Sequence, residues 1–241
     1  MAAAPGELMT RWLPRGAVAE ALTLWAVCFG AIVLTFVTVP WAAKLVATMG
    51  FLYLPLWSMD RRGEDYRELG LSTRRLGADV LDFLKVAGVV FPLFVAGYVL
   101  FTRAFVLLPL DWARLFTPYV NPPVFHFRLP DRFGEWVVDQ VFVVALPEEF
   151  FYRGFLQTRL RDAWPRGRVL WGARLGPAFW LTAVLFALGH LAIFQVWRLA
   201  VFFPALLFGW MRERSGSVVG AALFHAASNL LVQTLDASFF R

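Results

Sequence analysis

Apolar stretches long enough to cross a lipid bilayer recur along the whole chain of 241 residues. A transmembrane helix needs about 20 mainly apolar residues. Because 59% of the residues are hydrophobic and only 17% are charged, the chain is placed among membrane proteins with several spans. The predicted spans lie near residues 17–39, 41–58, 80–102, 135–157, 177–196, 199–212 and 216–235. The second and sixth are short, and Pro40 and Pro204 are equally compatible with a re-entrant or broken helix there. We therefore expect an all-α fold, a polytopic transmembrane helical bundle of about seven spans, with six or eight compatible with the same pattern.

The sequence contains no internal repeat, low-complexity tract or linker that would divide it, so residues 1–241 are predicted to form a single integral membrane domain. The first apolar run follows Arg11 and Arg15, as a secretory signal would. It is too long for a signal core and continues into further apolar sequence, so we predict a retained first helix. Residues 104–134 are rich in proline and aromatic residues and are predicted to form an interfacial loop.

The basic residues indicate orientation in a membrane rather than a nucleic-acid partner. The net charge is +6, but 21 of the 23 basic residues are arginines scattered through the loops between predicted helices. With the N-terminus inside, fourteen arginines fall on the inner side and six on the outer side, which favours a cytoplasmic N-terminus. The ratio of 21 Arg to 2 Lys is typical of a GC-rich bacterial genome, so we expect the bacterial inner membrane as the location.

The fourth span carries three charged residues, Glu148, Glu149 and Arg153, in an otherwise apolar stretch. Each costs about 2.5 to 3.5 kcal/mol near the bilayer centre, so this helix must hide its polar face inside a bundle. Residues four apart share a helix face, so Glu149 is predicted to pair with Arg153 while Glu148 stays free. Pro147 removes a backbone donor and loosens the helix beside them. The alternative is that both glutamates and Arg153 only form salt bridges that hold helices together. Such a structural role does not need two acidic residues for one basic residue.

Two of the three histidines also lie within predicted spans. His190 is in the fifth span, and His225 is in the last span, one turn before Asn229. Either histidine alone is compatible with hydrogen bonding between helices. Glu148, His190 and His225 are predicted to lie midway along their spans, and equal depth allows one shared cavity. The third histidine, His126, falls in the proline-rich loop and is left out of the predicted site.

These residue types together suit amide hydrolysis. A carboxylate and an imidazole that converge on a water molecule can act as a general base for attack on a carbonyl. An Asn amide and a His ring one turn apart can donate hydrogen bonds to the resulting oxyanion. A nucleophilic Ser or Cys is disfavoured, because Ser228 and Cys28 have no evident base partner in their own segments.

At these residues the sequence resembles the CPBP family of intramembrane endopeptidases, which contains CAAX proteases and bacteriocin-processing enzymes and is also called ABI. The family pattern is Glu-Glu-x-x-x-Arg, then Phe-x-x-x-His, then His-x-x-x-Asn or Asp. Here the three motifs run from Glu148 to Arg153, from Phe186 to His190 and from His225 to Asn229. The stretch 209–217 also looks like the turn that such proteins carry before the last motif. The resemblance covers about residues 135–235, the predicted catalytic core.

The resemblance implies a glutamate-dependent peptidase similar to the type II CAAX prenyl endopeptidases. Glu148 and His190 would activate water, His225 and Asn229 would hold the oxyanion, and Glu149 and Arg153 would be orienting residues. Because the family was long described as metalloproteases, a divalent metal such as zinc on Glu148, His190 and His225 is the alternative. We favour a route without cofactor, since these groups come from separate helices and no helix carries a ligand pair.

Some bacterial members of this family resemble myxosortases, which process C-terminal sorting tails. Prenylated CAAX substrates are not expected in a GC-rich bacterium, so the expected partner is a protein or peptide substrate with a membrane-anchored C-terminal segment. Two alternatives come from other classes: a non-proteolytic membrane scaffold of the same fold, and a transporter that uses Glu148 as a proton site. The transporter is disfavoured because the sequence shows no inverted repeat.

Overall fold

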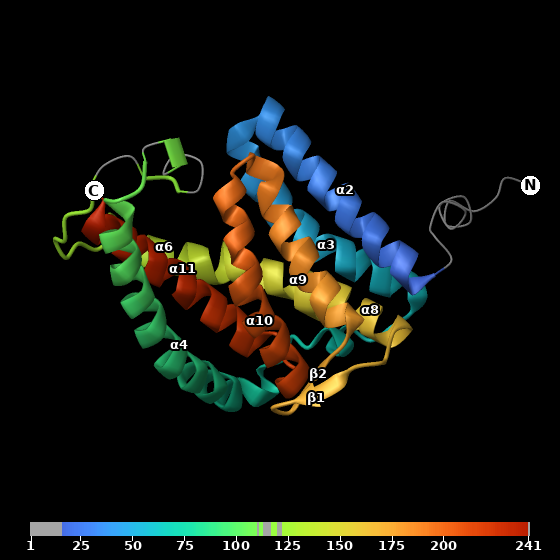
Figure 1. Ribbon diagram of the computed structural model, residues 1–241. Coiled ribbons are helices and arrows are strands. Elements are labelled where there is room, and N and C mark those ends of the chain that lie inside the picture. Colours follow the sequence, from blue (N-terminus) through green and yellow to red (C-terminus); the bar gives the residue numbers. More distant parts are fainter. Residues whose placement is uncertain (1–15, 110, 113–116, 120–121, 241) are drawn as a thin grey trace, which may run out of the picture.

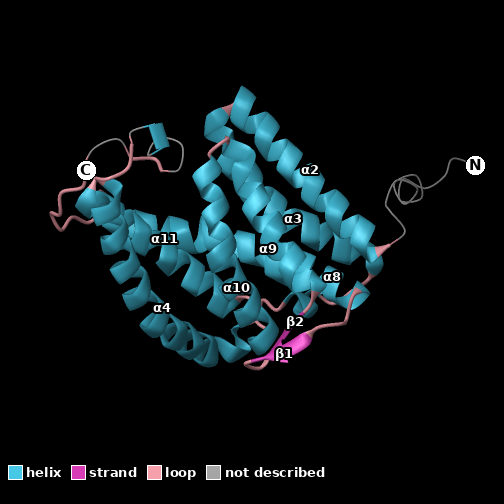
Figure 2. Cartoon of the chain, in the orientation of Figure 1, coloured by secondary structure: helices cyan, strands magenta, loops and turns pink. Residues whose placement is uncertain are grey.

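The regular structure of the chain is almost entirely helical (Figures 1 and 2). The structure is a computed structural model that describes residues 16–109, 111–112, 117–119 and 122–240. Arg11 and Arg15, on which the predicted orientation partly depends, lie outside these residues. The helices are α2 (Ala17–Thr38), α3 (Ala43–Arg62), α4 (Leu76–Phe105), α6 (Phe133–Val138), α7 (Leu146–Glu149), α8 (Gln157–Ala163), α9 (Pro177–Gly189), α10 (Phe202–Ser215) and α11 (Val219–Phe239). The predicted helical class is confirmed.

Three helical segments are long and apolar enough to cross a membrane: Ala17–Thr38, Pro40–Arg62 and Thr73–Phe105. The segment Pro177–Ile193 is apolar but shorter. On the three long segments many large apolar side chains are exposed, including Leu34 and Leu93, as expected for surfaces that face lipid. The count of seven spans stays a prediction.

Helices α6, α7 and α8 belong to one continuous helical run that passes through the middle of the bundle. Two π-helical stretches, Asp139–Ala145 and Phe150–Leu156, join the three α-helical pieces. The π geometry forms i to i+5 bonds and is often found at functional sites, and Pro147, which has no N–H, lies between the two stretches. The run packs against α2 and α3 on one side and α9, α10 and α11 on the other. It therefore contacts helices from both halves of the chain.

A short hairpin follows α8 and was not foreseen in the all-α prediction. Strand β1 (Arg168–Leu170) pairs antiparallel with β2 (Ala173–Leu175), and Leu170 faces Ala173. Trp171 and Gly172, between them, both have positive φ, of 49° and 80°, which is typical of a tight two-residue hairpin turn. This is the only sheet in the part of the chain that the structure describes.

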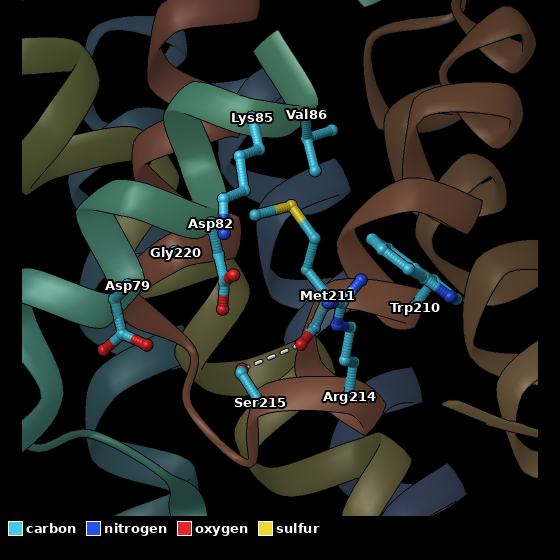
Figure 3. A pocket seen from close by; sticks show the side chains of 9 residues that line it. All are labelled: Asp79, Asp82, Lys85, Val86, Trp210, Met211, Arg214, Ser215 and Gly220. Atoms are coloured by element: carbon cyan, nitrogen blue, oxygen red, sulfur yellow. Dashed lines mark hydrogen bonds between the residues drawn. The ribbon is translucent and has the colours of Figure 1, made fainter. Parts of the chain in front are cut away.

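At one corner of the bundle α4 meets α10 and the start of α11 around a small cavity of about 30 Å³ (Figure 3). Asp79 is wholly buried there and accepts a hydrogen bond from the Ser217 hydroxyl at 2.8 Å. The hydroxyl of Ser215 donates to the backbone carbonyl of Met211 at 2.8 Å. These bonds fix the turn between α10 and α11, so that α11 enters the bundle beside the central run.

Candidate active site

The central run places Glu148 and Glu149 side by side, at the junction between α7 and the second π-helical stretch. As predicted from the four-residue spacing, Glu149 pairs with Arg153, with 3.2 Å between Oε2 and Nε, and both side chains are completely buried. The Arg153 guanidinium also donates to the backbone carbonyl of Ala205 at 3.2 Å and lies over the ring of Phe186, 4.8 Å from its centroid. The pair is thus held by α10 and α9 as well as by its own helix.

His225 joins this pair from α11. Its Nδ1 lies 3.0 Å from Oε1 of Glu149, and its ring stacks on Phe208 with 4.7 Å between centroids. Because a carboxylate only accepts hydrogen bonds, Nδ1 carries the hydrogen. The other ring nitrogen, Nε2, lies 4.0 Å from Oε2 of Glu148. His225 therefore stands between the two carboxylates, a position that the spacing of its own motif did not predict.

Glu148 has a different environment from Glu149. Its carboxylate makes no hydrogen bond to any residue that the structure describes, and its Oε2 is buried. Glu148 lines a cavity of about 160 Å³, together with His190 and the aromatic side chains of Trp25 and Phe51. A buried polar group without a partner is rare in a native protein. Glu148 therefore lies outside the ion pair of Glu149 with Arg153, and it borders a space that admits small molecules.

His190 lies at the C-terminal end of α9, not midway along a span as predicted, because α9 stops at Gly189 and the chain continues as a 3-10 turn. His225 likewise lies in the second turn of α11 rather than at its middle. Nδ1 of His190 lies 2.9 Å from the carbonyl of Phe186. A carbonyl only accepts, so Nδ1 carries the hydrogen, and the neutral ring keeps Nε2 as an acceptor.

Asn229 has a partner that the motifs did not indicate. Its Nδ2 donates to Oε1 of Gln140, on the first π-helical stretch, at 2.8 Å. The carboxamide has a second N–H, for which the described part of the chain offers no acceptor. Neither Asn229 nor His225 lines the cavity that Glu148 shares with His190. The predicted oxyanion role of Asn229 and His225 stays a prediction.

The proposed zinc ligands do not fit a metal in this geometry. Across the described residues, no group of three or more His, Cys, Asp or Glu side chains is arranged to hold a metal ion. Glu148 and His190 border the cavity, whereas His225 contacts Glu148 from outside it. Nδ1 of each histidine is engaged, by Glu149 or by the Phe186 carbonyl, which leaves Nε2 of each ring open. The misfit therefore lies in the placement of the three side chains and not in the hydrogen bonding of either ring.

Tyr152 and Arg198 also line the cavity, and the sequence analysis predicted neither as a site residue. Tyr152 lies inside the first motif, but an aromatic residue in a membrane span carries no signal by itself. Arg198 was counted only as a loop arginine. Its position beside the cavity depends on the 3-10 segment Val196–Val201, which packs against α9, α10 and the 3-10 turn that contains His190.

The Tyr152 hydroxyl fits closely against the end of α9, next to His190. It accepts a hydrogen bond from Nε1 of Trp25 at 3.2 Å, and a Cβ added at Gly189 would lie only 2.5 Å from Oη but 3.6 Å from Cζ. We expect Gly189→Ala to destabilise the protein by about 1 to 3 kcal/mol through overpacking and to lower the activity that the motifs predict by displacing His190. Thermal melting and an activity assay on the purified variant measure the two effects.

Two further variants test whether the clash with the Tyr152 hydroxyl causes the effects of Gly189→Ala. Tyr152→Phe removes the clashing hydroxyl, so Gly189→Ala combined with Tyr152→Phe should recover part of the stability and activity. Gly97→Ala, on α4, adds a Cβ where nothing lies within 4 Å and should be close to neutral. A Gly189→Ala protein as stable and active as the unsubstituted one would contradict this packing argument.

Comparison with known proteins gave one family match. Residues 134–231 match the family model described as type II CAAX prenyl endopeptidase Rce1-like. Searches of curated proteins and of solved structures found no match to the chain. The matched segment runs from α6 into α11 and contains Glu148, His190, His225 and Asn229. Together with three helices long and apolar enough to span a membrane, the match indicates an integral membrane protease. Through residues 134–231, which contain all three motifs, the chain is similar to the Rce1-like, type II CAAX prenyl endopeptidase family of proteases.

Proposed function

We propose that this protein is a glutamate-dependent intramembrane endopeptidase in which Glu148 and His190 activate the attacking water. The observation that carries the proposal is the Glu148 carboxylate, which makes no hydrogen bond to the described residues and lines one cavity with His190. A carboxylate in these surroundings is suited to accept a proton. The Nε2 lone pair of His190 supplies a second acceptor for the same water.

In the proposed reaction, Glu148 and His190 accept a proton from water and later release it to the leaving group. A water molecule between Glu148 and His190 gives up a proton to this pair as its oxygen attacks the carbonyl carbon of the peptide bond. The tetrahedral intermediate collapses when the C–N bond breaks and the proton passes to the leaving nitrogen. The products are a new C-terminal carboxylate, which keeps the water oxygen, and an amine, which leaves as an ammonium after it takes up the second proton of the water as well.

The other motif residues have supporting parts in this proposal. Glu149 and Arg153 orient His225, whose ring in turn faces Glu148. His225, as an imidazolium that carries a hydrogen on Nε2 as well as on Nδ1, and Asn229 are proposed as donors to the oxyanion, which requires the substrate carbonyl to reach the α11 side of Glu148. Hydrogen bonds in a substrate-free site are commonly long and tighten when substrate binds.

The proposed substrate is a client protein cleaved near its C-terminal or membrane-anchor segment, such as a sorting tail of the kind that myxosortases process. The location that we propose is the bacterial inner membrane, with the N-terminus in the cytoplasm. Three apolar segments of spanning length support access from within the bilayer. The cavity wall beside Glu148 is formed largely by apolar and aromatic side chains, which favours apolar substrate residues at the site.

Comparative C-terminal proteomics tests the function. A deletion strain complemented with the unsubstituted protein should show truncated client C-termini that are missing when the complementing gene carries Glu148→Gln. The non-proteolytic scaffold makes a different prediction: client lengths stay the same in all strains, and a membrane complex is lost only in the deletion strain. That second pattern would overturn the proposal.

Removal of metal ions is expected to leave the peptidase activity unchanged. Because the donor groups are not arranged to hold a metal ion, purified protein should keep its peptidase activity after prolonged treatment with a strong chelator. Elemental analysis of the active sample should find no stoichiometric zinc. Activity that is lost on chelation and restored by adding back zinc would show that the metal-dependent alternative is right.

A further inference from the structure

The cavity beside Glu148 contains one cationic side chain, that of Arg198. Among the described residues that line the cavity, Glu148 is the only acidic and Arg198 the only basic one of the Asp, Glu, Lys and Arg types, and the other titratable side chains there are those of His190, Tyr152 and Cys28. The remaining wall is mainly apolar, as at Ile32 and Phe51. Arg198 is half-buried, and placing a guanidinium partly in apolar surroundings costs free energy unless it binds a partner.

The hydrogen-bonding groups of Arg198 are only partly used. Its Nε donates to Oε1 of Gln195 at 2.7 Å, and this bond fixes the side chain on the 3-10 segment Val196–Val201. Within the described part of the chain its two terminal nitrogens have no hydrogen-bond acceptor. The positive charge is attracted by Glu148, but no ion pair joins the two groups. Arg198 therefore presents two N–H-bearing nitrogens that its neighbours leave free.

A planar guanidinium with two free terminal nitrogens matches a carboxylate, which it binds through two parallel hydrogen bonds. Glu148 is needed as the proton acceptor in the proposed reaction, so the matching carboxylate must come from the substrate. A peptide carries one at its C-terminus and can carry others on Asp or Glu side chains. The cavity, of about 160 Å³, is smaller than common ligand pockets of about 300 to 1,000 Å³, so only a short piece of substrate fits between Arg198 and the reacting carbonyl.

We infer that Arg198 is a specificity-determining residue that binds a carboxylate of the peptide substrate, in the first place the C-terminal one, and so fixes the scissile bond a short distance from it. This inference rests on the proposed peptidase function. The recognised part of the substrate is then an anionic group that binds Arg198 in a cavity lined mainly by apolar side chains.

The test uses the full-length protein, purified in detergent, and libraries of short internally quenched peptides built from Ala, Val, Leu and Phe. One library has a free C-terminal carboxylate, a second has a C-terminal carboxamide, and a third has the carboxamide plus one internal Glu. We expect the unsubstituted protein to prefer the free acid over the carboxamide by about 10- to 100-fold in kcat/KM, as for a hydrogen bond to a charged group. The third library distinguishes a side-chain carboxylate from the terminal one.

Arg198→Gln should abolish the preference for the free acid over the carboxamide by raising KM for the free-acid library. Arg198→Lys keeps the charge and should keep part of the preference. The matched control is Arg214→Gln, since Arg214 lines the small cavity beside α4 (Figure 3) and lies over Trp210, outside the site. That control should keep the full preference.

The measurements test the peptidase function and the role of Arg198 separately. If the unsubstituted protein cleaves none of the libraries, the proposed function fails, and the inference fails with it. If it cleaves acid and carboxamide equally, or if Arg198→Gln retains the preference, the role of Arg198 is wrong and the peptidase proposal stands. An equal loss of kcat on all libraries in a normally folded Arg198→Lys protein would also overturn the inference, because it would place Arg198 in the chemical step.

Discussion

Replacing Glu148 by glutamine is expected to abolish peptide hydrolysis and to leave the fold intact. Glutamine has nearly the same shape but cannot accept the proton of the attacking water, and general base catalysis contributes about 100- to 10,000-fold. Stability should change little, because the Glu148 carboxylate makes no hydrogen bond that the described structure would lose. The measurement is kcat/KM of the purified variant, with its melting temperature beside it.

Glu135→Gln is the matched control. Glu135 belongs to the same helical run, is exposed, and forms an ion pair with Arg132 far from the cavity. Its replacement should preserve both activity and stability. A Glu148→Gln protein that cleaves substrate at the normal rate would contradict the assigned role of the carboxylate.

Glu149 and Arg153 form a buried ion pair, and removing one partner is expected to destabilise the fold strongly. Glu149→Ala is expected to destabilise the protein by about 3 to 5 kcal/mol, since it leaves a buried charge without its partner. Arg153 and Glu149 are both inaccessible to solvent, and His225 would lose the acceptor of its Nδ1 hydrogen as well. Unfolding in detergent by heat or denaturant measures the loss, and Glu148→Ala, which breaks no such pair, should cost much less.

The pair can be tested as a unit by a double-mutant cycle. If Glu149 and Arg153 neutralise each other, removing both in Glu149→Leu with Arg153→Met should destabilise far less than the sum of the single replacements. Additive losses would show that the two residues contribute separately and that their ion pair is unimportant for folding.

The parts of the site that lie within one helix could be predicted from the sequence. Glu149 and Arg153 are four residues apart, and the helical period alone places them on one face. The freedom of Glu148 follows from the same geometry, because a single arginine leaves one of two adjacent acids unpaired. The helical class followed from the length and composition of the apolar stretches.

The contacts between helices could not be predicted, because they depend on where each helix ends and how it is rotated. The early end of α9 places His190 in a 3-10 turn, and the π-helical stretches shift residues such as Gln140 away from the face that an α-helix would give them. Consequently His225 meets Glu149, and Asn229 meets Gln140. A regular helical period contains no information on either pairing.

The most direct test of the central claim, that Glu148 and His190 act on one water molecule, is a comparison of kcat/KM among Glu148→Gln, His190→Gln and the protein carrying both. Residues that act as a unit give strongly non-additive losses. The predicted result is that each single variant loses activity by about 100- to 10,000-fold and that the double variant loses little more than the worse of the two. Losses that multiply in the double variant, or a fully active His190→Gln protein, would contradict the account.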